Sequence, residues 1–355
     1  MASRRRVRVL VVDDSAMIRE LLAELLESDP VIEVVGTAAD GAFVEARCKR
    51  LRPDVITLDL EMPQVDGITV LRKHLGTPVV VVSGTTEAGT ARAIEALAEG
   101  AVDCMGKPHA DETGDLSGYA KLLCAKVKAA ADAKISHQGP RSLAPSRTSG
   151  PRTGEPPLLS PRRSGRPGAS GRIVAIGAST GGTVALERVL KRLPPGGAPI
   201  LVTQHIPKRF SGALAKRLDT ITRLSVFEAT DGQEVRRGCV YIAPGDLHLC
   251  LGRRGGAYVC RLSDGLPVHR HKPSVDVLFR SVAKVAGHNA VGVLLTGMGH
   301  DGGRGMCEIR RAGGLTLAQD EATSVIWGMP QAAIKAGGAC EVLPLLDIPA
   351  RLQAS

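Results

Sequence analysis

Short apolar runs alternate with amphipathic stretches along the first third of the chain. The runs that indicate buried β-strands are residues 7–12, 31–38, 55–58, 79–82 and 101–105. The stretches with helical periodicity are residues 17–27, 42–50, 68–75, 90–99 and 116–131. Apolar strands that alternate with helices are typical of a parallel sheet covered on both faces. The pattern therefore predicts a five-stranded, doubly wound α/β domain over residues 5–130.

The same alternation resumes at residue 172 and continues almost to the end of the chain. The expected strands are residues 173–176, 200–203, 239–243, 290–295 and 315–318. The expected helices are residues 185–193, 274–286, 306–312 and 331–336. No internal repeat relates this part to the first. We expect a second, larger doubly wound α/β domain with a parallel sheet over residues 172–352.

Residues 131–171, between the two domains, differ in composition from both. Pro and Gly recur without a period, and apolar residues are few. Eight basic residues and a single acid, Glu155, lie between Lys134 and Arg172. Such a segment cannot bury enough apolar surface to offset its ordering entropy, so we expect a disordered tether. Its simplest role is that of a spacer with solubilising charge.

Charge and composition argue against several kinds of partner and site. The formal net charge is +10, but most of it lies in the tether, so no folded basic face for nucleic acid is expected. Aromatic residues make up only 2% of the chain, which leaves few platforms for stacked bases. No apolar run approaches the roughly 18 residues of a membrane span, so we expect no direct membrane insertion. The eight cysteines contain no CxxC pair, which favours a reducing cytoplasm over a disulfide framework or zinc site.

Chemically active residues follow the strands of the first domain. Asp13 and Asp14 follow the first strand, Asp59 follows the third, Ser83 ends the fourth and Lys107 follows the fifth. Residues just beyond the carboxyl ends of parallel strands meet in one crevice. Crowded carboxylates repel unless a hard cation binds, and oxygen ligands suit Mg²⁺. A single strand-end acid would be explained by helix capping alone, but the whole set predicts a magnesium site with a lysine for a phosphoryl group.

The sharpest motif of the second domain lies between its first strand and first helix. Gly177-Ala-Ser179-Thr-Gly181 fits the G-x-S-x-G pattern of a nucleophile on a sharp strand-to-helix turn. The amides that follow, Thr180 first, begin a helix, where developing negative charge is favoured. Two alternatives remain open: a phosphate-cradling loop, although the P-loop lysine is missing, and a plain tight turn.

A serine hydroxyl needs a base, and the base needs an orienting partner. His205 directly follows a strand, in the same position as Ser179, and Asp301 lies in the loop after the strand at 290–295. We therefore predict a triad with Ser179 as nucleophile, His205 as general base and Asp301 fixing the imidazole tautomer. The backbone amides of Thr180 and Met298 are the predicted oxyanion donors. The chain order Ser…His…Asp differs from that of α/β-hydrolases, so another topology is expected.

The first domain carries a set of motifs at its strand ends: Val-Val-Asp13-Asp14-Ser, Leu58-Asp59-Leu-Glu-Met62-Pro63, Asp66-Gly67, Ser83 and Lys107-Pro108. With these motifs, residues 7–128 resemble the receiver domain of bacterial response regulators. The resemblance implies that Asp59 is the phospho-acceptor. It also implies that Asp14, Asp59 and the backbone carbonyl of Glu61 hold Mg²⁺, with Asp13 contributing through water, while Ser83 and Lys107 contact the phosphoryl oxygens. Cys104 stands where the family usually carries an aromatic switch residue, so a rotating ring is not expected there.

The second domain carries six motifs: Gly-Ala-Ser179-Thr-Gly-Gly, Thr203-Gln-His205-Ile-Pro207, Tyr241-Ile-Ala-Pro-Gly-Asp246-Leu-His248, Arg270-His-Lys-Pro-Ser274-Val-Asp276-Val-Leu-Phe279, Leu295-Thr-Gly-Met-Gly-His-Asp301-Gly and Trp327-Gly-Met-Pro330. With these motifs, residues 172–350 resemble the catalytic domain of chemotaxis protein-glutamate methylesterases. The implied activity is hydrolysis of glutamate 5-O-methyl esters on methyl-accepting chemoreceptors, with methanol release, and deamidation of receptor glutamines. His300 stands beside Asp301 where an asparagine would be expected, which adds a second imidazole to the neighbourhood.

The order of receiver, linker and esterase also implies regulation. The unphosphorylated receiver would pack over the esterase cleft, and phosphoryl transfer from a chemotaxis histidine kinase to Asp59 would loosen that packing. The competing interpretation is a receiver with a non-enzymatic output, either a nucleic-acid binder or a phosphate-binding scaffold. The first would need a helix-turn-helix and a basic folded face, and neither is found in the sequence.

Overall fold

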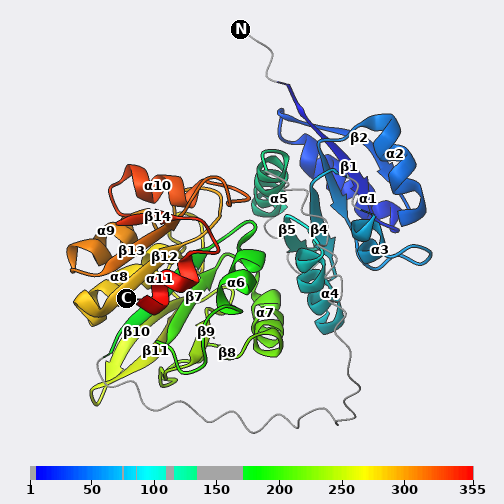
Figure 1. Cartoon of the computed structure of the whole chain (residues 1–355). Helices are drawn as coiled ribbons and strands as arrows, with labels where there is room; N and C mark the ends of the chain where they lie inside the picture. Colours follow the sequence, from blue (N-terminus) through cyan, green and yellow to red (C-terminus); the bar gives the residue numbers. More distant parts are fainter. Residues whose placement is uncertain (1–4, 74–75, 85, 109–115, 134–170, 355) are drawn as a thin grey trace, which may run out of the picture.

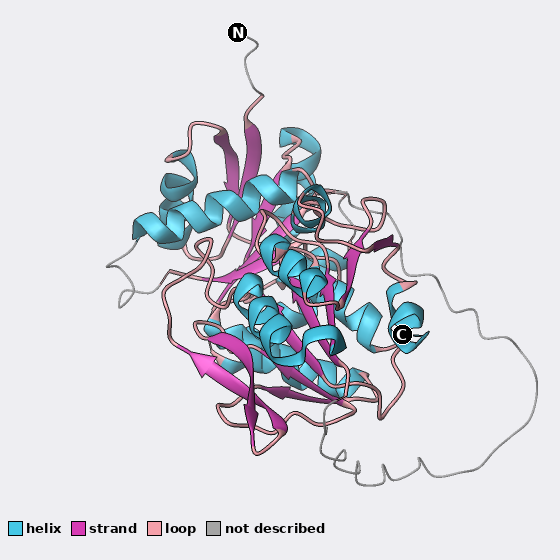
Figure 2. Cartoon of the chain, turned by 90° about the vertical axis from the view of Figure 1, so that its left-hand side faces the viewer, coloured by secondary structure: helices cyan, strands magenta, loops and turns pink. Residues whose placement is uncertain are grey.

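The computed structural model describes residues 5–73, 76–84, 86–108, 116–133 and 171–354, which form two α/β domains (Figure 1). Most of the expected tether, and the end of the helix expected at 68–75, lie outside the described residues. Figure 2 shows the two domains one above the other, with helices lying over the strands. No helix in the described ranges combines the length and the apolar character needed to cross a bilayer.

The first domain is a five-stranded parallel sheet in the order β2-β1-β3-β4-β5. Its strands are β1 Val7–Val12, β2 Ile32–Ala38, β3 Val55–Leu58, β4 Val79–Ser83 and β5 Asp103–Gly106. Its helices are α1 Ala16–Glu27, η1 Gly41–Phe43, α2 Val44–Leu51, α3 Gly67–Arg72, α4 Glu87–Ala98 and α5 Leu116–Ala131. The expectation of a five-stranded doubly wound domain is confirmed.

One strand of this domain begins later than the sequence pattern predicts. Ala101, the expected start of the fifth strand, still donates its amide to Ala96 O at 3.0 Å in the exit turn of α4. Val102 is the first residue to join the sheet, through Val79 O at 2.8 Å, and β5 proper begins at Asp103. Ala101 therefore belongs to the turn that ends α4, although its hydrophobicity alone assigns it to the strand.

The second domain is a seven-stranded parallel sheet in the order β14-β13-β12-β6-β7-β9-β8, with a separate antiparallel pair, β10 and β11. The strands are β6 Ile173–Ala178, β7 Ile200–Gln204, β8 Ser225–Glu228, β9 Cys239–Ile242, β10 His248–Arg254, β11 Ala257–Ser263, β12 Ala290–Leu294, β13 Leu315–Gln319 and β14 Glu341–Leu343. The helices are α6 Gly182–Leu190, α7 Lys208–Ile221, α8 Val275–Ala286, η3 Gly287–Asn289, α9 Gly303–Arg311, α10 Met329–Lys335 and α11 Ile348–Ala354. The prediction of a larger parallel α/β domain is confirmed.

Several elements of this domain were not predicted. Helix α7 buries Phe210, Leu214 and Leu218 at a spacing of four, a helical signal that Gly212 and the surrounding charges obscure. The pair β10–β11 turns at Gly255 and Gly256, both at positive φ, as a tight hairpin requires. Strands β8 and β14 lie at the sheet edges and are short, so they carry little apolar signal.

The strand order places the candidate residues together. Strands β12, β6 and β7 are neighbours, and β6 is buried along its whole length. The chain leaves β6 toward β7 on one side, while β12 lies on the other side, so the strand order reverses here and leaves a crevice at the carboxyl ends. Helix α8 packs closely on β6, because a Cβ at Gly177 would lie only 2.2 Å from Val275 Cγ1. The crevice is therefore bordered by the first turn of α8.

The two domains are in direct contact. Helix α4 of the first domain lies beside α6 and α7 of the second (Figure 1). Lys216 on α7 pairs with Glu87 on α4 at 2.7 Å, and Val325 packs against the apolar cluster of the first domain. The first domain therefore covers the side of the second domain on which the loop after β6 lies.

Candidate functional sites

Ser179 occupies the turn between β6 and α6. Its amide donates to Thr296 O at 3.0 Å, and Gly181 at the start of the helix has φ 75°, a left-handed conformation that suits glycine. A Cβ at Gly297 would lie 2.7 Å from Ser179 Cβ. The glycine therefore allows the loop after β12 to approach the serine. Ser179 itself is half-buried.

His205 lies beside Ser179 at the end of the next strand. Ala178 and Gln204 are register partners, and the His205 amide donates to Ala178 O at 3.0 Å. The two candidate residues are thus the first positions beyond a paired strand end. His205 Nε2 lies 2.8 Å from Asp301 Oδ2, whereas its Nδ1 is buried and finds no hydrogen-bond partner among the described residues. Nδ1 is therefore the ring nitrogen free to exchange a proton.

Asp301 is a buried carboxylate held by the first turn of α8. It is 1% exposed and accepts hydrogen bonds from Ser274 Oγ at 2.8 Å, Val275 N at 2.8 Å and Asp276 N at 3.0 Å. Burial alone raises the pKa of a carboxyl group, but the hydrogen bond from His205 and those from the helix amides outweigh it. The pKa of Asp301 therefore lies well below its usual range. An ionised Asp301 accepts the His205 Nε2 proton, which leaves Nδ1 as the basic nitrogen.

Sequence reasoning missed the groups that hold Asp301. Ser274 and the two amides belong to a helix start that the sequence predicts, but no local signal shows what that helix end faces. Sequence reasoning also gave His248 and His271 no role of their own. His248 Nδ1 accepts from Ser274 N at 3.1 Å, which fixes the same helix start, and His271 stacks on His205.

The predicted oxyanion donors lie on the two loops that border Ser179. Thr180 is buried and Met298 is 41% exposed. Among the described residues, neither backbone amide donates a hydrogen bond, so both are available to an incoming group. The Thr180 side chain is engaged: its hydroxyl donates to Asp103 Oδ2 of the first domain at 2.6 Å.

The carboxylates of the first domain gather as the strand ends predict. Ligand oxygens of Asp13, Asp14 and Asp59 lie within 4.8 Å of one another. Lys107 Nζ lies 2.7 Å from Asp13 Oδ2 and 2.9 Å from Asp59 Oδ2. Burial alone would lower the pKa of Lys107, but its contacts with these two carboxylates outweigh it and raise the pKa above its ordinary value. The burial of Asp13 raises the pKa of its carboxyl group.

The donor set fits a hard cation and a phosphoryl group. Asp59 Oδ1 and Ser83 Oγ are buried and have no hydrogen-bond partner among the described residues. Asp14 is exposed beside them, and Glu61 follows Asp59 by two residues on the exposed side of the cluster. Oxygen donors of this kind suit Mg²⁺, and the unpaired oxygen of Asp59 is open to a new bond.

The two unusual residues of the sequence have ordinary surroundings. Cys104 is 2% exposed, and burial raises the pKa of its thiol to about 12, so it remains a neutral thiol inside the fold. The exposed His300 places its Nε2 3.1 Å from His269 Nδ1. His300 thus contacts a histidine of the neighbouring turn, while Asp301 keeps its hydrogen bond with His205.

Comparison with known proteins agrees with this architecture. Residues 174–352 match the family model described as CheB methylesterase, and residues 9–115 match that of the response regulator receiver domain. A protein-glutamate methylesterase/protein-glutamine glutaminase of Xanthomonas campestris pv. campestris is 49% identical, covering 98% of this chain and 97% of the relative. The enzyme of the same name from Hydrogenovibrio crunogenus is 44% identical, covering 98% of each chain.

A solved structure extends the comparison to the catalytic domain. The CheB methylesterase catalytic domain of Thermotoga maritima is 42% identical and has a TM-score of 0.51, covering 51% of this chain and 97% of that one. The two domains define a response-regulator receiver domain joined to a methylesterase catalytic domain. The chain belongs to the CheB methylesterase family.

The electrostatics of Asp301 predict a specific pH dependence of stability. An unfolded aspartate titrates at about pH 3.9, and the pKa of Asp301 is lower in the folded chain. Its contribution to the free energy of unfolding is therefore complete above that pH and is lost as the pH falls toward the folded value. We expect Asp301→Asn to be less stable than wild type in urea unfolding near pH 6, and the difference to shrink between pH 5 and 3.

The control is Asp347→Asn, which alters an exposed aspartate of the same domain. Its difference from wild type should be small at every pH. A constant difference for Asp301→Asn across the same range would mean that the carboxylate is not held ionised by its neighbours.

Proposed function

We propose that this protein hydrolyses glutamate 5-O-methyl esters on methyl-accepting chemotaxis receptors, releasing methanol, and deamidates receptor glutamines. One observation carries the catalytic assignment. His205 Nε2 lies 2.8 Å from the buried Asp301 Oδ2, and Ser179, His205 and Asp301 follow three adjacent strands. The names of the relatives support the substrate class. The catalytic residues are Ser179, His205 and Asp301.

The reaction begins when Ser179 Oγ attacks the ester carbonyl while His205 Nδ1 takes its proton. Asp301 stabilises the imidazolium through Nε2 and remains ionised. The negative charge on the carbonyl oxygen is stabilised by the amides of Thr180 and Met298, each worth roughly 10²–10³ in rate. His205 then returns the proton to the leaving methoxide, and methanol departs from the acyl-enzyme.

Water completes the cycle by the same route. His205 removes a proton from water, which attacks the acyl-enzyme, and then returns that proton to Ser179 Oγ as glutamate is released. A glutamine side chain enters the same sequence with ammonia as the leaving group. No metal is needed for this chemistry, because the donors of the Ser179 loop and the imidazole supply charge stabilisation and proton transfer.

Regulation begins in the receiver domain. We assign Asp59 as the acceptor of a phosphoryl group from a chemotaxis histidine kinase. Asp13, Asp14, Asp59 and the backbone carbonyl of Glu61 would hold Mg²⁺, which neutralises charge on the transferred group. Lys107, which pairs with Asp13 and Asp59, would turn to the phosphoryl oxygens together with the unpaired hydroxyl of Ser83.

The receiver closes the esterase through contacts on the nucleophile loop. Val102 O accepts from Gly181 N at 3.3 Å, and Asp103 Oδ2 accepts from Thr180 Oγ1 at 2.6 Å. Lys126 on α5 holds the other oxygen of Asp103 at 2.5 Å. A receiver carbonyl and a receiver carboxylate thus occupy donors on the two residues that follow Ser179. While these contacts are in place, the receiver lies against the loop whose Thr180 amide we assign to the oxyanion, and it would hinder the approach of a substrate carbonyl.

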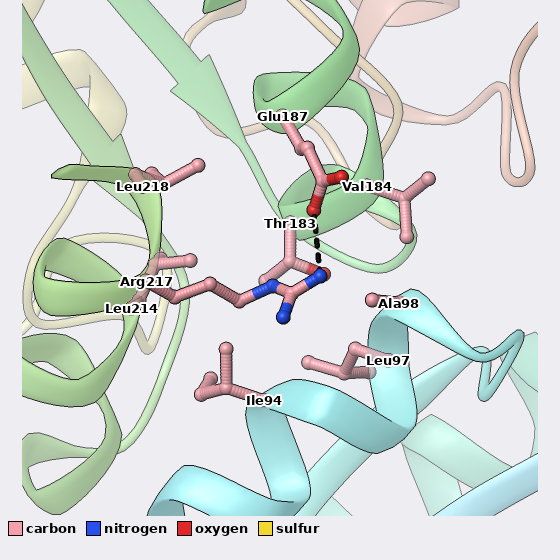
Figure 3. A pocket seen from close by; sticks show the side chains of 9 residues that line it. All are labelled: Ile94, Leu97, Ala98, Thr183, Val184, Glu187, Leu214, Arg217 and Leu218. Carbon is pink, nitrogen blue, oxygen red and sulfur yellow. Dashed lines mark hydrogen bonds and ion pairs between the residues drawn. The ribbon is translucent and has the colours of Figure 1, made fainter. Parts of the chain in front are cut away.

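Apolar packing supports these polar contacts. Figure 3 shows Ile94, Leu97 and Ala98 of α4 facing Leu214 and Leu218 of α7 across a small pocket. The Arg217–Glu187 pair at 3.2 Å spans α7 and α6 beside it. An incompletely filled contact of this kind favours the closed state only modestly. A preference of about 1–3 kcal/mol for the closed state would leave a minor open population. If phosphorylation favoured the open state by a similar free energy, the open state would become the major one.

The setting we infer is the cytoplasm. None of the eight cysteines forms a disulfide, and the thiols of Cys104 and Cys260 have pKa values raised to about 12 by burial. Such neutral, buried thiols suit a reducing compartment. The receptors and the kinase would be reached there as protein partners.

Replacement of the nucleophile is the direct test of the catalytic assignment. Ser179→Ala should abolish methanol release from methylated receptor membranes, measured with and without acetyl phosphate, while receptor binding is retained. Labelling by a serine-reactive phosphonate should be lost in parallel. Hydrolysis at the wild-type rate by the variant would show that the nucleophile is another residue.

The assignment of Asp59 as phospho-acceptor is tested by replacing its carboxylate with an amide. Asp59→Asn should keep the basal rate of methanol release and lose stimulation by acetyl phosphate, because an amide cannot form the acyl phosphate. Stimulation equal to that of wild type would refute the assignment of Asp59.

The closing contact is tested in the absence of phosphodonor. A hydrogen bond to a charged group contributes about 1.5–3 kcal/mol, so Asp103→Ala should raise the basal rate roughly tenfold, or to the phosphorylated ceiling if that is lower. Lys216→Ala is the matched control, since it breaks an interdomain pair whose side chains are 77% and 86% exposed, and such pairs contribute about 0–1 kcal/mol. Equal basal rates for Asp103→Ala and wild type would remove this contact from the mechanism.

A further inference from the structure

A second imidazole covers one face of the proposed catalytic base. The rings of His205 and His271 are stacked, with centroids 3.8 Å apart and planes inclined by only 6°. The His205 side chain is 7% exposed as a result of this and its other contacts. The mechanism described above uses the edge of the His205 ring, at Nδ1 and Nε2, and leaves this stacked face without a role.

The stack is built by a tight turn of unusual composition. Val268 and His271 exchange backbone hydrogen bonds at 3.0 and 2.9 Å, so His269 and Arg270 form a two-residue turn. Both turn residues are left-handed, with φ 52° and 66°. This conformation is usually supplied by Asn-Gly, and bulkier residues adopt it at an energetic cost. Such strain persists where the surroundings fix the conformation, and it is concentrated at functional positions.

The surroundings of the turn are the same groups that hold Asp301. His269 Nε2 lies 3.0 Å from Asp276 Oδ2, and Asp276 Oδ1 accepts from Gly305 N at 2.7 Å. Asp276 also donates its amide to Asp301. The turn that carries His271 is therefore anchored to the first turn of α8, which also fixes the carboxylate partner of His205. His271 and Asp301 are held in one frame, one at the face of the His205 ring and one at its edge.

We propose that His271 is a positioning residue, whose flat ring fixes the plane of His205 so that Nε2 stays on Asp301 and Nδ1 stays free of other partners. This inference rests on the proposed function of His205. A hydrogen bond to Asp301 alone leaves the imidazole free to swing about that contact. A second ring stacked at 3.8 Å removes this freedom, both when His205 is neutral and when it carries the serine proton.

The charge state of His271 suits this role. Burial, followed by the neighbouring His205, lowers the pKa of His271 to about 4. Lys126 of the receiver also lowers the pKa of His271, whereas Asp301 and the backbone of His269 raise it by less than burial lowers it. At neutral pH the ring is uncharged, so it can lie on a protonated His205 without repulsion.

Two other roles for the stacked pair are less consistent with the geometry. Ligand atoms of His205, His271 and Asp301 lie within 4.8 Å of one another, as in a metal site. However, the lone pairs of parallel rings lie in parallel planes and do not converge on one ion. His271 Nδ1 is buried and has no hydrogen-bond partner among the described residues, so a proton-carrying role remains as an outcome of the test.

The experiment compares His271→Phe with His271→Ala in the full chain, with acetyl phosphate present and methanol release as the assay. Phe keeps a flat face but has no ring nitrogen. We expect His271→Ala to lower kcat about tenfold with little change in KM. We expect the acid limb of its pH profile to move to higher pH, because an uncovered imidazolium is better hydrated. His271→Phe should recover most of kcat and the wild-type acid limb.

Two measurements separate positioning from stability and from proton transfer. His288→Ala, at an exposed histidine outside the site, should leave kcat unchanged, and thermal melts should confirm that all variants are folded at the assay temperature. Ring ¹⁵N NMR should show one His205 tautomer in wild type and His271→Phe, and a mixture in His271→Ala. If His271→Phe lowered kcat as much as His271→Ala, and both variants showed a single His205 tautomer, the proposal would be overturned. The ring nitrogens of His271 would then have a direct role. Full activity of Ser179→Ala would instead refute the underlying hydrolase function.

Discussion

The second domain is organised around one buried charge. The Asp301 carboxylate is almost fully excluded from water and is stabilised by a serine hydroxyl, two helix amides and an imidazole. A buried carboxylate with fewer donors would be neutral, and its partner histidine would lose its fixed tautomer. The start of α8, the loop after β12 and the end of β7 must therefore keep their relative positions. The close packing of Val275 on Gly177 meets this requirement by seating α8 directly on the strand that leads to the serine.

The receiver acts on this arrangement at its polar surface and leaves the buried charge untouched. Its contacts are to Thr180 and Gly181, one and two residues after the nucleophile, while Asp301 and His205 keep their hydrogen bond. The contacts between the domains thus leave the His205–Asp301 pair intact. Opening requires the loss of a few interdomain contacts and no rearrangement of the catalytic groups, which suits a switch driven by one phosphoryl group.

Much of this organisation can be predicted from the sequence, because it follows from a single rule of parallel sheets. Ser179, His205 and Asp301 were identified as residues beyond strand ends, and the structure brings them to three adjacent strands. The same rule gathered Asp13, Asp59 and Lys107. Their catalytic and phosphoryl roles remain proposals.

The remaining features depend on contacts without a local sequence signal. Asp103 lies at a strand start in one domain and meets Thr180, 77 positions later in the chain, in another. His271 is placed by a turn whose His-Arg sequence does not predict a left-handed conformation. Helix α7 was missed because its apolar positions are separated by charged residues and a glycine. Tertiary contacts decide all three cases, and a periodicity argument does not contain them.

Strand β5 has a consequence for the open enzyme. It is the edge strand of the receiver sheet, and in the closed form the Val102 carbonyl just before it is bonded to Gly181. Separation of the domains would leave that backbone bare, and unprotected sheet edges tend to recruit other chains. The edge is only four residues long, and it begins with the Asp103 carboxylate beside the Lys126 ammonium. Charges at a short edge discourage intermolecular strand pairing, so the groups that form the proposed closing contact would also limit strand pairing between open molecules.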